Sequence, residues 1–342
     1  MFNNVLGIDL GTASVLIYMK GKGIVLNEPS VVAFHKATKT VIAVGKEARE
    51  MEGKTPPEIE TIRPLENGVI SNFTMTEAMI KAFLGRVVRR LVGNVKIMMC
   101  VPSGVTDVEQ RAVIETAREI GAKEIYIMEE PVAAAMGAGI DVSRAYGTMV
   151  VDIGGGTTDI AVISMGKIIS GRSMKIAGGA FTDAVERFMK REYNMTIGPQ
   201  TAEYLKHSVG CVCREDENPA VVVRGISTVT GLPKKVMVSA QELRPAFEEL
   251  VHNIVERIRD VLEESDAQLQ SDILKSGIVL TGGGSLIRGL DQRIIEAAGV
   301  HTFYADDPQT CVARGAGAAL DLVGADDLAG YRRFYKKAYI HS

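Results

Sequence analysis

Two segments of the chain combine aspartate, glycine and threonine in the same order. "GIDLGTAS" contains Asp9, Gly11 and Thr12, and "DIGGGTTD" contains Asp152 and the run 154–157. Each lies between apolar runs and therefore predicts a β-hairpin with these residues at its tip. Glycines let backbone N–H groups approach an anion closely, and threonine hydroxyls add donors. One such hairpin could equally be a plain turn, but a second copy favours two hairpins that hold one polyphosphate between them.

The two aspartates add a requirement of their own. Carboxylates at Asp9 and Asp152 would repel a phosphate, so their place beside it makes sense only with a cation between them. A hard divalent ion such as Mg²⁺, bound to the carboxylates through water, fits best. The hairpins therefore predict a site for a polyphosphate with magnesium.

A third glycine-rich segment follows a buried strand near the end of the chain. "GIVLTGGGSLIRGL" places Gly282, Gly283 and Gly284 where an apolar run stops, and we expect a helix directly after them. Glycines between the end of a strand and the start of a helix are suited to contact with a nucleoside or its phosphates. Alone this motif is weak, but it joins two others of the same kind.

The elements between these motifs alternate between strand and helix in two halves, with a boundary expected at 141–145. In the first half, "CVPSGVTDVEQ" predicts a strand, a turn and a helix capped by Ser103 or Thr106. A small-residue helix is expected to begin near Pro131. In the second half, residues 220–240 predict a hairpin, and "ELRPAFEELVHNIVERIRDVLEE" predicts an amphipathic helix that packs on the core.

Composition limits the classes of function. A chain of 342 residues with 46% hydrophobic and 24% charged residues predicts a globular protein of about two domains. The net charge of −3 argues against general nucleic-acid binding, so no nucleic-acid partner is expected. The four cysteines lack paired C-x-x-C spacing, and Cys211 with Cys213 alone does not predict a metal site. The apolar surroundings of Cys100 and Cys311 predict buried thiols in a reducing compartment. We expect no secretory signal or membrane span.

Taken together, the motifs resemble a known superfamily. "GIDLGTAS", "DIGGGTTD", "EEPVAAAMGAG" and "LTGGGSLIRGL" occur in the order found in actin, heat-shock chaperones and sugar kinases. Within that group, "GKGIVLNEPSVVA", "IRPLENGVI", "CVPSGVTDVEQRAV", "VTGLP" and "ADDPQTCVARGAGAAL" resemble MreB and Mbl, the bacterial actin homologues. The resemblance runs from about Leu6 to Leu320. It departs from the family pattern at Ser14, Asp159 and Ala180.

The resemblance implies an α/β actin-like ATPase fold, with two similar domains that each carry a smaller subdomain around a nucleotide cleft. Domain I would span 1–141, with its subdomain at about 30–75. Domain II would span 142–325, with its subdomain at about 180–242, and its last helix, at about 311–323, would return to domain I. Residues 326–342 would form a basic and aromatic tail.

The resemblance also implies roles for individual residues. Glu130, helped by Thr157, would orient the attacking water, although an acid at a helix start has a structural explanation as well. Asp9 and Asp152 would hold Mg²⁺ through water. The nucleotide-binding residues would be Gly11, Thr12, Ala13, Ser14, Gly154, Gly155, Gly156, Thr157, Glu203, Tyr204, Leu205, Lys206, Gly282, Gly283, Gly284 and Ser285.

The implied function is that of a cytoskeletal protein that binds and slowly hydrolyses ATP with Mg²⁺ as it polymerises. Its antiparallel double filaments would lie on the inner face of the cytoplasmic membrane, control rod shape and guide cell-wall synthesis with partners like RodZ, MreC and MreD. A chaperone-type or sugar-kinase-type ATPase is the alternative. We expect no substrate-binding domain after the last motif and no sugar cleft, which makes this alternative the weaker one.

Two apolar and basic segments are candidates for membrane contact. Leu91 and Val92 stand beside arginines in "RVVRRLVGNV", and Phe334 and Tyr335 belong to the tail "YRRFYKKAYI". Aromatic rings suit the headgroup boundary, and each basic residue near an anionic surface adds roughly 1 kcal/mol. The alternative for the tail is a solvated or filament-contacting segment.

Overall fold

Two five-stranded sheets organise the molecule, and a computed structural model describes residues 4–88, 95–103, 105–119, 122, 124–213 and 217–322. The first sheet runs in the order β10 (Glu124–Glu129), β9 (Val95–Val101), β1 (Asn4–Leu10), β2 (Ser14–Met19) and β3 (Gly23–Pro29). The second runs in the order β18 (Thr302–Tyr304), β17 (Ile278–Thr281), β11 (Thr148–Ile153), β12 (Thr158–Ser164) and β13 (Lys167–Met174).

The two sheets have the same topology. In each, a central strand forms an antiparallel hairpin with the next strand, and a third strand extends that hairpin. Two further strands pair in parallel on the other side of the central strand. The internal repeat read from the sequence is therefore a repeat of architecture.

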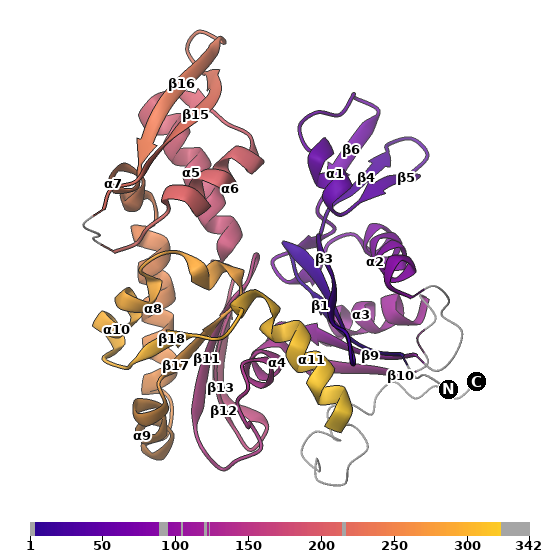
Figure 1. Cartoon of the computed structure of the whole chain (residues 1–342), viewed down its shortest axis with the longest axis vertical. Helices are drawn as coiled ribbons and strands as arrows, with labels where there is room; N and C mark the ends of the chain where they lie inside the picture. Colours follow the sequence, from indigo (N-terminus) through magenta and orange to yellow (C-terminus); the bar gives the residue numbers. More distant parts are fainter. Residues whose placement is uncertain are drawn as a thin grey trace.

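Helices cover both faces of each sheet (Figure 1). On the outer face of the first sheet lie α2 (Phe73–Val87) and α3 (Asp107–Glu119). The outer face of the second sheet carries α8 (Glu248–Glu263), α9 (Ala267–Ser276) and α10 (Leu290–Ala298). Helix α5 (Gly178–Tyr193) extends away from this sheet into the smaller unit above it. Between the two sheets lie α4 (Glu130–Gly137) and α11 (Cys311–Leu322).

The pair α4 and α11 packs unusually closely because small residues face each other. A Cβ added at Gly315 would lie 1.8 Å from the carbonyl oxygen of Ala133. A Cβ added at Gly7 of β1 would lie 2.5 Å from the backbone nitrogen of Gly317. Helix α11, although it follows the second sheet in the chain, thus packs directly against the first strand of the first sheet.

A smaller unit extends from each sheet, and the two stand on the same side of the molecule (Figure 1). The first contains β4 (Val32–His35), β5 (Val41–Val44), α1 (Lys46–Met51) and β6 (Ile59–Ile62), followed by the short hairpin of β7 (Leu65–Glu66) and β8 (Val69–Ile70). The second contains β14 (Met195–Thr196), α6 (Pro199–Val209), β15 (Ala220–Ser227), β16 (Pro233–Ser239) and α7 (Ala240–Leu243).

Several local expectations are confirmed. Thr106, rather than Ser103, caps α3, since its hydroxyl accepts from the backbone N–H of Glu109 while the Glu109 carboxylate accepts from Thr106. Pro131 stands in the first turn of α4. The expected hairpin at 220–240 forms β15 and β16, and the apolar face of α8 is buried.

The third glycine segment differs from expectation. After β17 the chain forms a short 3₁₀ turn, η2 (Gly283–Leu286), and α10 begins only at Leu290. Gly282 has a φ of 79° and Gly289 a φ of 81°, and both lie in the left-handed region that a right-handed helix cannot include. No helix in the described part of the chain has the length and hydropathy needed to cross a membrane.

Candidate functional site

The alternation of side chains along the central strands places the two aspartates face to face. Asp9 lies on β1 and Asp152 on β11, and both project from the inner faces of their sheets, towards the layer of α4 and α11. Their strand neighbours point into the outer cores: Leu6, Ile8 and Leu10 on β1, and Met149, Val151 and Ile153 on β11. Because side chains on a strand alternate with a period of two, the apolar outer residues determine where the carboxylates point.

The two carboxyl groups lie close enough to perturb each other. Burial raises the pKa of Asp9 to about 7, and repulsion from Asp152 contributes. Burial likewise raises the pKa of Asp152 to about 7, although the Thr281 hydroxyl, which donates a hydrogen bond of 2.7 Å to its Oδ1, opposes the shift. A divalent cation between them would favour the ionised form of both, so the donor set fits Mg²⁺.

The tips of the two hairpins meet. A Cβ added at Gly155 would lie 2.4 Å from the Cβ of Ala13, and one added at Gly156 would lie 2.4 Å from Oγ1 of Thr12. Only glycine permits this approach. The same Thr12 Oγ1 accepts a hydrogen bond of 2.9 Å from the backbone N–H of Gly68, in the turn between β7 and β8.

The other residues of the tips hold the turns together. Gly11 accepts a hydrogen bond of 2.6 Å from the Ser30 hydroxyl through its carbonyl oxygen. Gly154 donates its N–H to the carbonyl of Thr157, at 2.9 Å. Ser14 begins β2, opposite Pro29. The structure thus brings Thr12 and Ala13 of the first hairpin together with Gly155 and Gly156 of the second.

The start of α5 faces the second hairpin. The backbone N–H groups of Gly178 and Gly179 donate to the carbonyls of Gly154 and Gly155, at 3.0 and 2.8 Å. This contact ties the hairpin to a helix N-terminus, where the helix dipole favours negative charge.

Glu130 lies in the same region as the aspartates. It is the first residue of α4, its side chain is buried, and its pKa is raised well above the ordinary value by burial and by repulsion from Asp159, Asp9 and Asp152. Its neighbour Glu129 is less buried, and its pKa is also raised, by burial and Asp159. Glu130 therefore faces the carboxylate cluster, as a residue that acts on bound phosphate must.

Asp159 is a member of this cluster that the motif analysis did not include among the site residues. It pairs with Asp152 across the second hairpin and is fully buried, and its Oδ1 accepts a hydrogen bond of 2.8 Å from the backbone N–H of Ser103. The motif "DIGGGTTD" could have indicated this role. It begins and ends with an aspartate, and these two residues pair when the glycines between them form the turn of the hairpin.

The residues of α6 are divided among three environments. Glu203 and Lys206 are partly buried and make polar contacts, Leu205 is buried in the core, and Tyr204 is 56% exposed. The Lys206 ammonium donates hydrogen bonds of 3.0 Å to the carbonyl oxygen of Gly178 and to Thr182 Oγ1. Burial lowers the pKa of Lys206.

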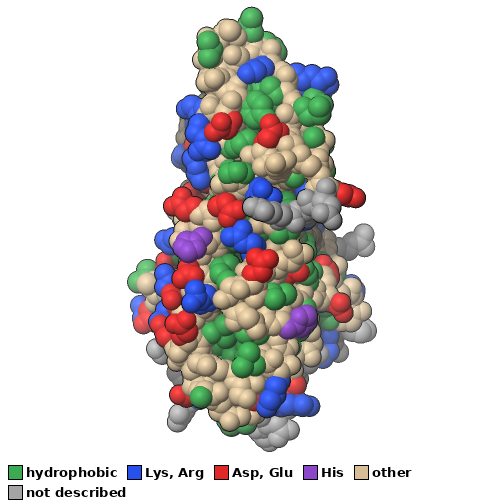
Figure 2. Space-filling view, turned by 90° about the vertical axis from the view of Figure 1, so that its left-hand side faces the viewer, with side chains coloured by type: hydrophobic (Ala, Val, Ile, Leu, Met, Phe, Trp, Pro, Cys, Tyr) green, Lys and Arg blue, Asp and Glu red, His purple; other side chains and the backbone are tan. Residues whose placement is uncertain are grey.

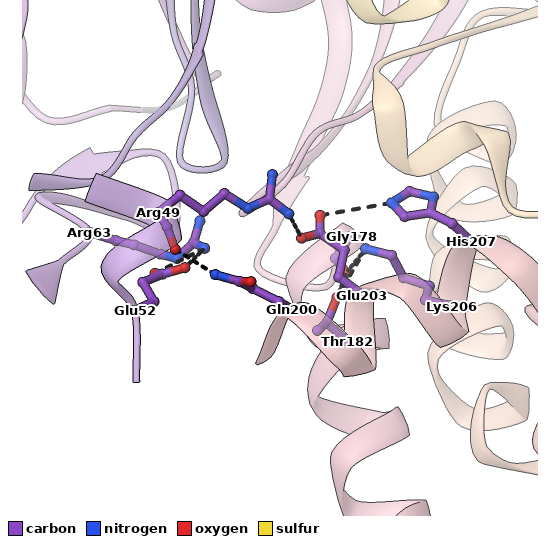
Figure 3. A network of polar contacts seen from close by, with 9 residues as sticks. All are labelled: Arg49, Glu52, Arg63, Gly178, Thr182, Gln200, Glu203, Lys206 and His207. Atoms are coloured by element: carbon purple, nitrogen blue, oxygen red, sulfur yellow. Dashed lines mark hydrogen bonds and ion pairs between the residues drawn. The ribbon is translucent and has the colours of Figure 1, made fainter. Parts of the chain in front are cut away.

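Two residues of α6 also reach across to α1 (Figure 3). The Glu203 carboxylate forms an ion pair with Arg49, and the Gln200 amide donates to the Arg49 carbonyl oxygen at 2.5 Å. Bonding to His207, together with the charge of Arg49, lowers the pKa of Glu203 to about 2. We call the contacts of Arg49 with Gln200 and Glu203 the clasp. Arg49 and Gln200 carry no motif, so sequence reasoning had no means of finding them.

The third glycine segment packs on the second hairpin. A Cβ at Gly282 would lie 2.3 Å from the carbonyl oxygen of Ile153, and a Cβ at Gly284 would lie 2.7 Å from the Ile153 side chain. Ser285 is buried and donates to the Gly282 carbonyl at 2.7 Å, whereas Gly283 faces Gln309. The segment is thus adjacent to Asp152. The expected membrane residues Leu91, Val92, Phe334 and Tyr335 lie outside the described residues.

Comparisons with known proteins identify the family of the chain. The family model described as MreB/Mbl protein matches residues 3–327. Cell shape-determining protein Mbl of Bacillus subtilis (strain 168) is 47% identical over 94% of this chain and 97% of its own length. Cell shape-determining protein MreB of Escherichia coli (strain K12) is 45% identical over 94% of this chain and 95% of its own.

A solved structure gives the same result for the fold. MreB 5 of Spiroplasma citri, bound to AMPPNP or to ADP, superposes with a TM-score of 0.90 and is 36% identical, covering 94% of this chain and 97% of that one. The expected actin-like fold is confirmed, and relatives that determine cell shape do not favour the chaperone or sugar-kinase alternative. The chain belongs to the MreB/Mbl family of actin-like cytoskeletal proteins.

Proposed function

We propose that this chain binds ATP with Mg²⁺ between its two hairpins, with residues 1–141 and 142–325 as the two domains around the nucleotide. The observation that carries the proposal is the meeting of the hairpin tips above two facing carboxylates, Asp9 and Asp152. The nucleotides bound to MreB 5 of Spiroplasma citri support it.

Different segments of the chain bind different parts of the nucleotide in this proposal. Residues 11–14 and 154–157 hold the phosphates through backbone N–H groups and hydroxyls, while Asp9 and Asp152 hold the cation through water. Residues 203–206 and 282–285 line the adenosine side, and within the first of these segments Glu203 and Lys206 are the residues that make polar contacts.

Hydrolysis of ATP needs a positioned water and neutralised charge more than it needs a covalent nucleophile. Glu130 polarises and orients that water, and Thr157, at the second hairpin, helps to hold it. Bound Mg²⁺ supplies the positive charge that offsets the charge of the phosphates. We propose that the protein is in this way a slow ATPase whose turnover is coupled to polymerisation.

The Glu130→Gln variant tests the catalytic assignment. Glutamine keeps the shape of the side chain but cannot accept a proton, so phosphate release should fall by roughly 10²-fold or more while binding of a fluorescent ATP analogue changes little. Glu129→Gln, at the neighbouring and less buried position, is the matched control and should keep most of the activity. Unchanged phosphate release in Glu130→Gln would show that another group orients the water.

Self-association into antiparallel double filaments is the second part of the proposal. Figure 2 shows hydrophobic side chains on the upper part of one face, where β15 and β16 lie. This hairpin exposes Val222, Ile226, Val229, Leu232 and Met237. Contiguous exposed apolar side chains on a folded protein mark interaction surfaces. Light scattering and electron microscopy with ATP or ADP test it, and the absence of any polymer under both conditions would refute it.

We further propose a cytoplasmic protein, peripheral at the cytoplasmic membrane, that works with partners like RodZ, MreC and MreD. Many weak contacts along a filament add up, so single subunits need bind only weakly. Flotation with anionic liposomes of the full chain, a Leu91→Ser/Val92→Ser variant and a chain ending at Gly330 locates the anchor. If both altered proteins float as well as the parent, neither segment is the anchor.

A further inference from the structure

Two cysteines that the proposed function does not use lie side by side immediately after α6. Their sulfur atoms, Sγ of Cys211 and Sγ of Cys213, are 3.6 Å apart. Cys211 is 2% exposed and Cys213 is 9% exposed. The chain bends just after the short parallel bridge between Cys211 and Arg288, and this bend keeps both side chains on one side.

The backbone around the two cysteines is fixed by hydrogen bonds to three arginines. The carbonyl oxygens of residues 210, 212 and 213 each accept from one guanidinium, of Arg288 at 3.3 Å, Arg293 at 2.9 Å and Arg244 at 3.3 Å respectively. The N–H of residue 212 donates to the Arg288 carbonyl at 2.9 Å. The sulfur atoms are thus held near each other by the backbone.

A second constraint acts on Cys213 from the other side. A Cβ added at Gly289, whose φ is 81°, would lie 2.1 Å from the Cys213 sulfur. The Cys211 thiol donates to the Cys213 carbonyl at 3.2 Å. The position of each sulfur is therefore determined by close packing as well as by the backbone.

Both cysteines line the same cavity, of about 390 Å³, together with Asn218, Gln241 and Arg244. A cavity of this size admits a small reagent to thiols that are otherwise covered. The other two cysteines, Cys100 and Cys311, belong instead to the core between the sheets, and burial raises the pKa of both of these thiols. The pair is therefore the place where a small thiol reagent is expected to act first.

We propose that Cys211 and Cys213 form a reversible dithiol–disulfide site in the folded protein, with a low-molecular-mass disulfide as oxidant. The Cys213 thiolate, as the more exposed group, attacks one sulfur of the oxidant, forms a mixed disulfide and releases one thiolate. The Cys211 thiolate then attacks the Cys213 sulfur and releases the second thiolate. The protein loses two electrons and two protons, and the oxidant becomes two thiols.

The geometry favours a labile disulfide over a permanent one. A disulfide needs its sulfur atoms about 2.05 Å apart, so they must approach by roughly 1.5 Å from their present separation. Closing so short a ring against a backbone held by three arginines strains the bond, and strained disulfides are the readily reduced ones. The site also lies where the end of α6 meets the turn that follows η2.

Peptide mapping tests the proposal directly, because trypsin leaves the two paired cysteines in one peptide and the other two cysteines in two different peptides. Cleavage after Lys206 and Arg214 gives the peptide 207–214, which contains Cys211 and Cys213, while Cys100 and Cys311 fall in peptides 97–111 and 294–314. The folded full chain is treated with glutathione disulfide and then unfolded in denaturant that contains N-ethylmaleimide, which labels the remaining free thiols. The protein is digested with trypsin, and the peptide masses are measured by mass spectrometry.

Peptide 207–214 is expected to be lighter by two hydrogen atoms and free of maleimide, while the other two cysteine peptides carry the label. Dithiothreitol should restore two labels. In Cys213→Ser, which lacks the attacking thiol, the peptide should instead carry one label, and in Cys211→Ser, which lacks the thiol that closes the disulfide, it should carry a glutathione adduct. Two labels on 207–214 after oxidation, two glutathione adducts on it, or equally fast loss of label from Cys100 and Cys311 would each overturn the proposal.

Discussion

The contact between α4 and α11 predicts an unusual effect for the substitution Gly315→Ala. Alanine is ordinarily the better helix former, by about 1 kcal/mol in a helix interior. At Gly315, however, the added Cβ would lie 1.8 Å from the carbonyl oxygen of Ala133, and the obstacle is backbone that no side-chain rotation can move. The two helices would have to separate locally by more than about 1 Å to restore an ordinary contact distance.

That separation sets the magnitude of the effect. Overpacking a well-packed core costs about 1–3 kcal/mol, and a clash with backbone belongs at the upper end of that range or above it. After subtracting the helix propensity gained, we expect Gly315→Ala to lower the free energy of unfolding by about 2–3 kcal/mol. Gly85→Ala is the matched control, because Gly85 lies in α2 with nothing within 4 Å of the added Cβ. It should raise stability by about 0.5–1 kcal/mol.

Urea unfolding of both variants and the parent, followed by circular dichroism, measures the difference. The two alanine variants should move the transition midpoint in opposite directions. If Gly315→Ala is as stable as Gly85→Ala, the helices do not approach as closely as described and the reasoning about α11 is refuted.

The clasp and the hairpin tips give the remaining predictions. The pKa of Glu203 is lowered to about 2 from 4.5, so its ionised form contributes stability above pH 4.5 that is lost as the pH falls towards 2. The side chains of Arg49 and Glu203 are both about one third exposed, so Glu203→Gln should lower the free energy of unfolding at pH 7 by only about 1 kcal/mol. The difference from the parent should shrink below pH 4.5. Urea unfolding midpoints of both proteins at pH 7 and below pH 4.5 measure this change. Arg49→Ala should lose a similar amount at pH 7 and the double variant little more, whereas additive losses would show that the two residues do not act as a pair. Gly156→Ala, whose added Cβ would lie 2.4 Å from Thr12 Oγ1, should weaken binding of a fluorescent ATP analogue by roughly tenfold or more, about 1.4 kcal/mol, and an affinity within twofold of the parent would contradict that role.

The features that sequence predicted well were those with a strict period or a repeated motif. The repeated motif between apolar runs was enough to expect Asp9 and Asp152 at two similar hairpins. The duplicated motif also implied duplicated architecture, and the two sheets share one topology. In both cases a local pattern carries information about a global arrangement.

Other features depend on contacts between distant segments and leave no local pattern. The clasp joins α1 to α6. The sequence around Arg49 and around Gln200 contains no motif that distinguishes either residue from an ordinary surface residue. The run 203–206 illustrates a different limit, because consecutive residues on a helix point in different directions. Only Glu203 and Lys206, three positions apart, are partly buried and make polar contacts.

The delayed start of α10 has a conformational cause. A strand followed by glycines predicted a helix at once, but the positive φ values of Gly282 and Gly289 insert a 3₁₀ turn first. The sequence shows where a glycine stands. It does not show whether that glycine is needed for a close approach of two segments, for a turn with positive φ, or for neither. At Gly282 both uses occur, since its missing side chain leaves room for the Ile153 carbonyl.

The position of α11 has a consequence for the biosynthesis of the protein. Strand β1 leaves the ribosome early, but its inner face is covered by a helix that ends at Leu322. The first sheet cannot complete its core on that side until translation has passed this helix, so the nascent first half keeps an apolar surface open throughout synthesis of the second. Ribosome-bound chains of increasing length should therefore resist protease at Gly7 and its neighbours only once α11 has emerged from the exit tunnel.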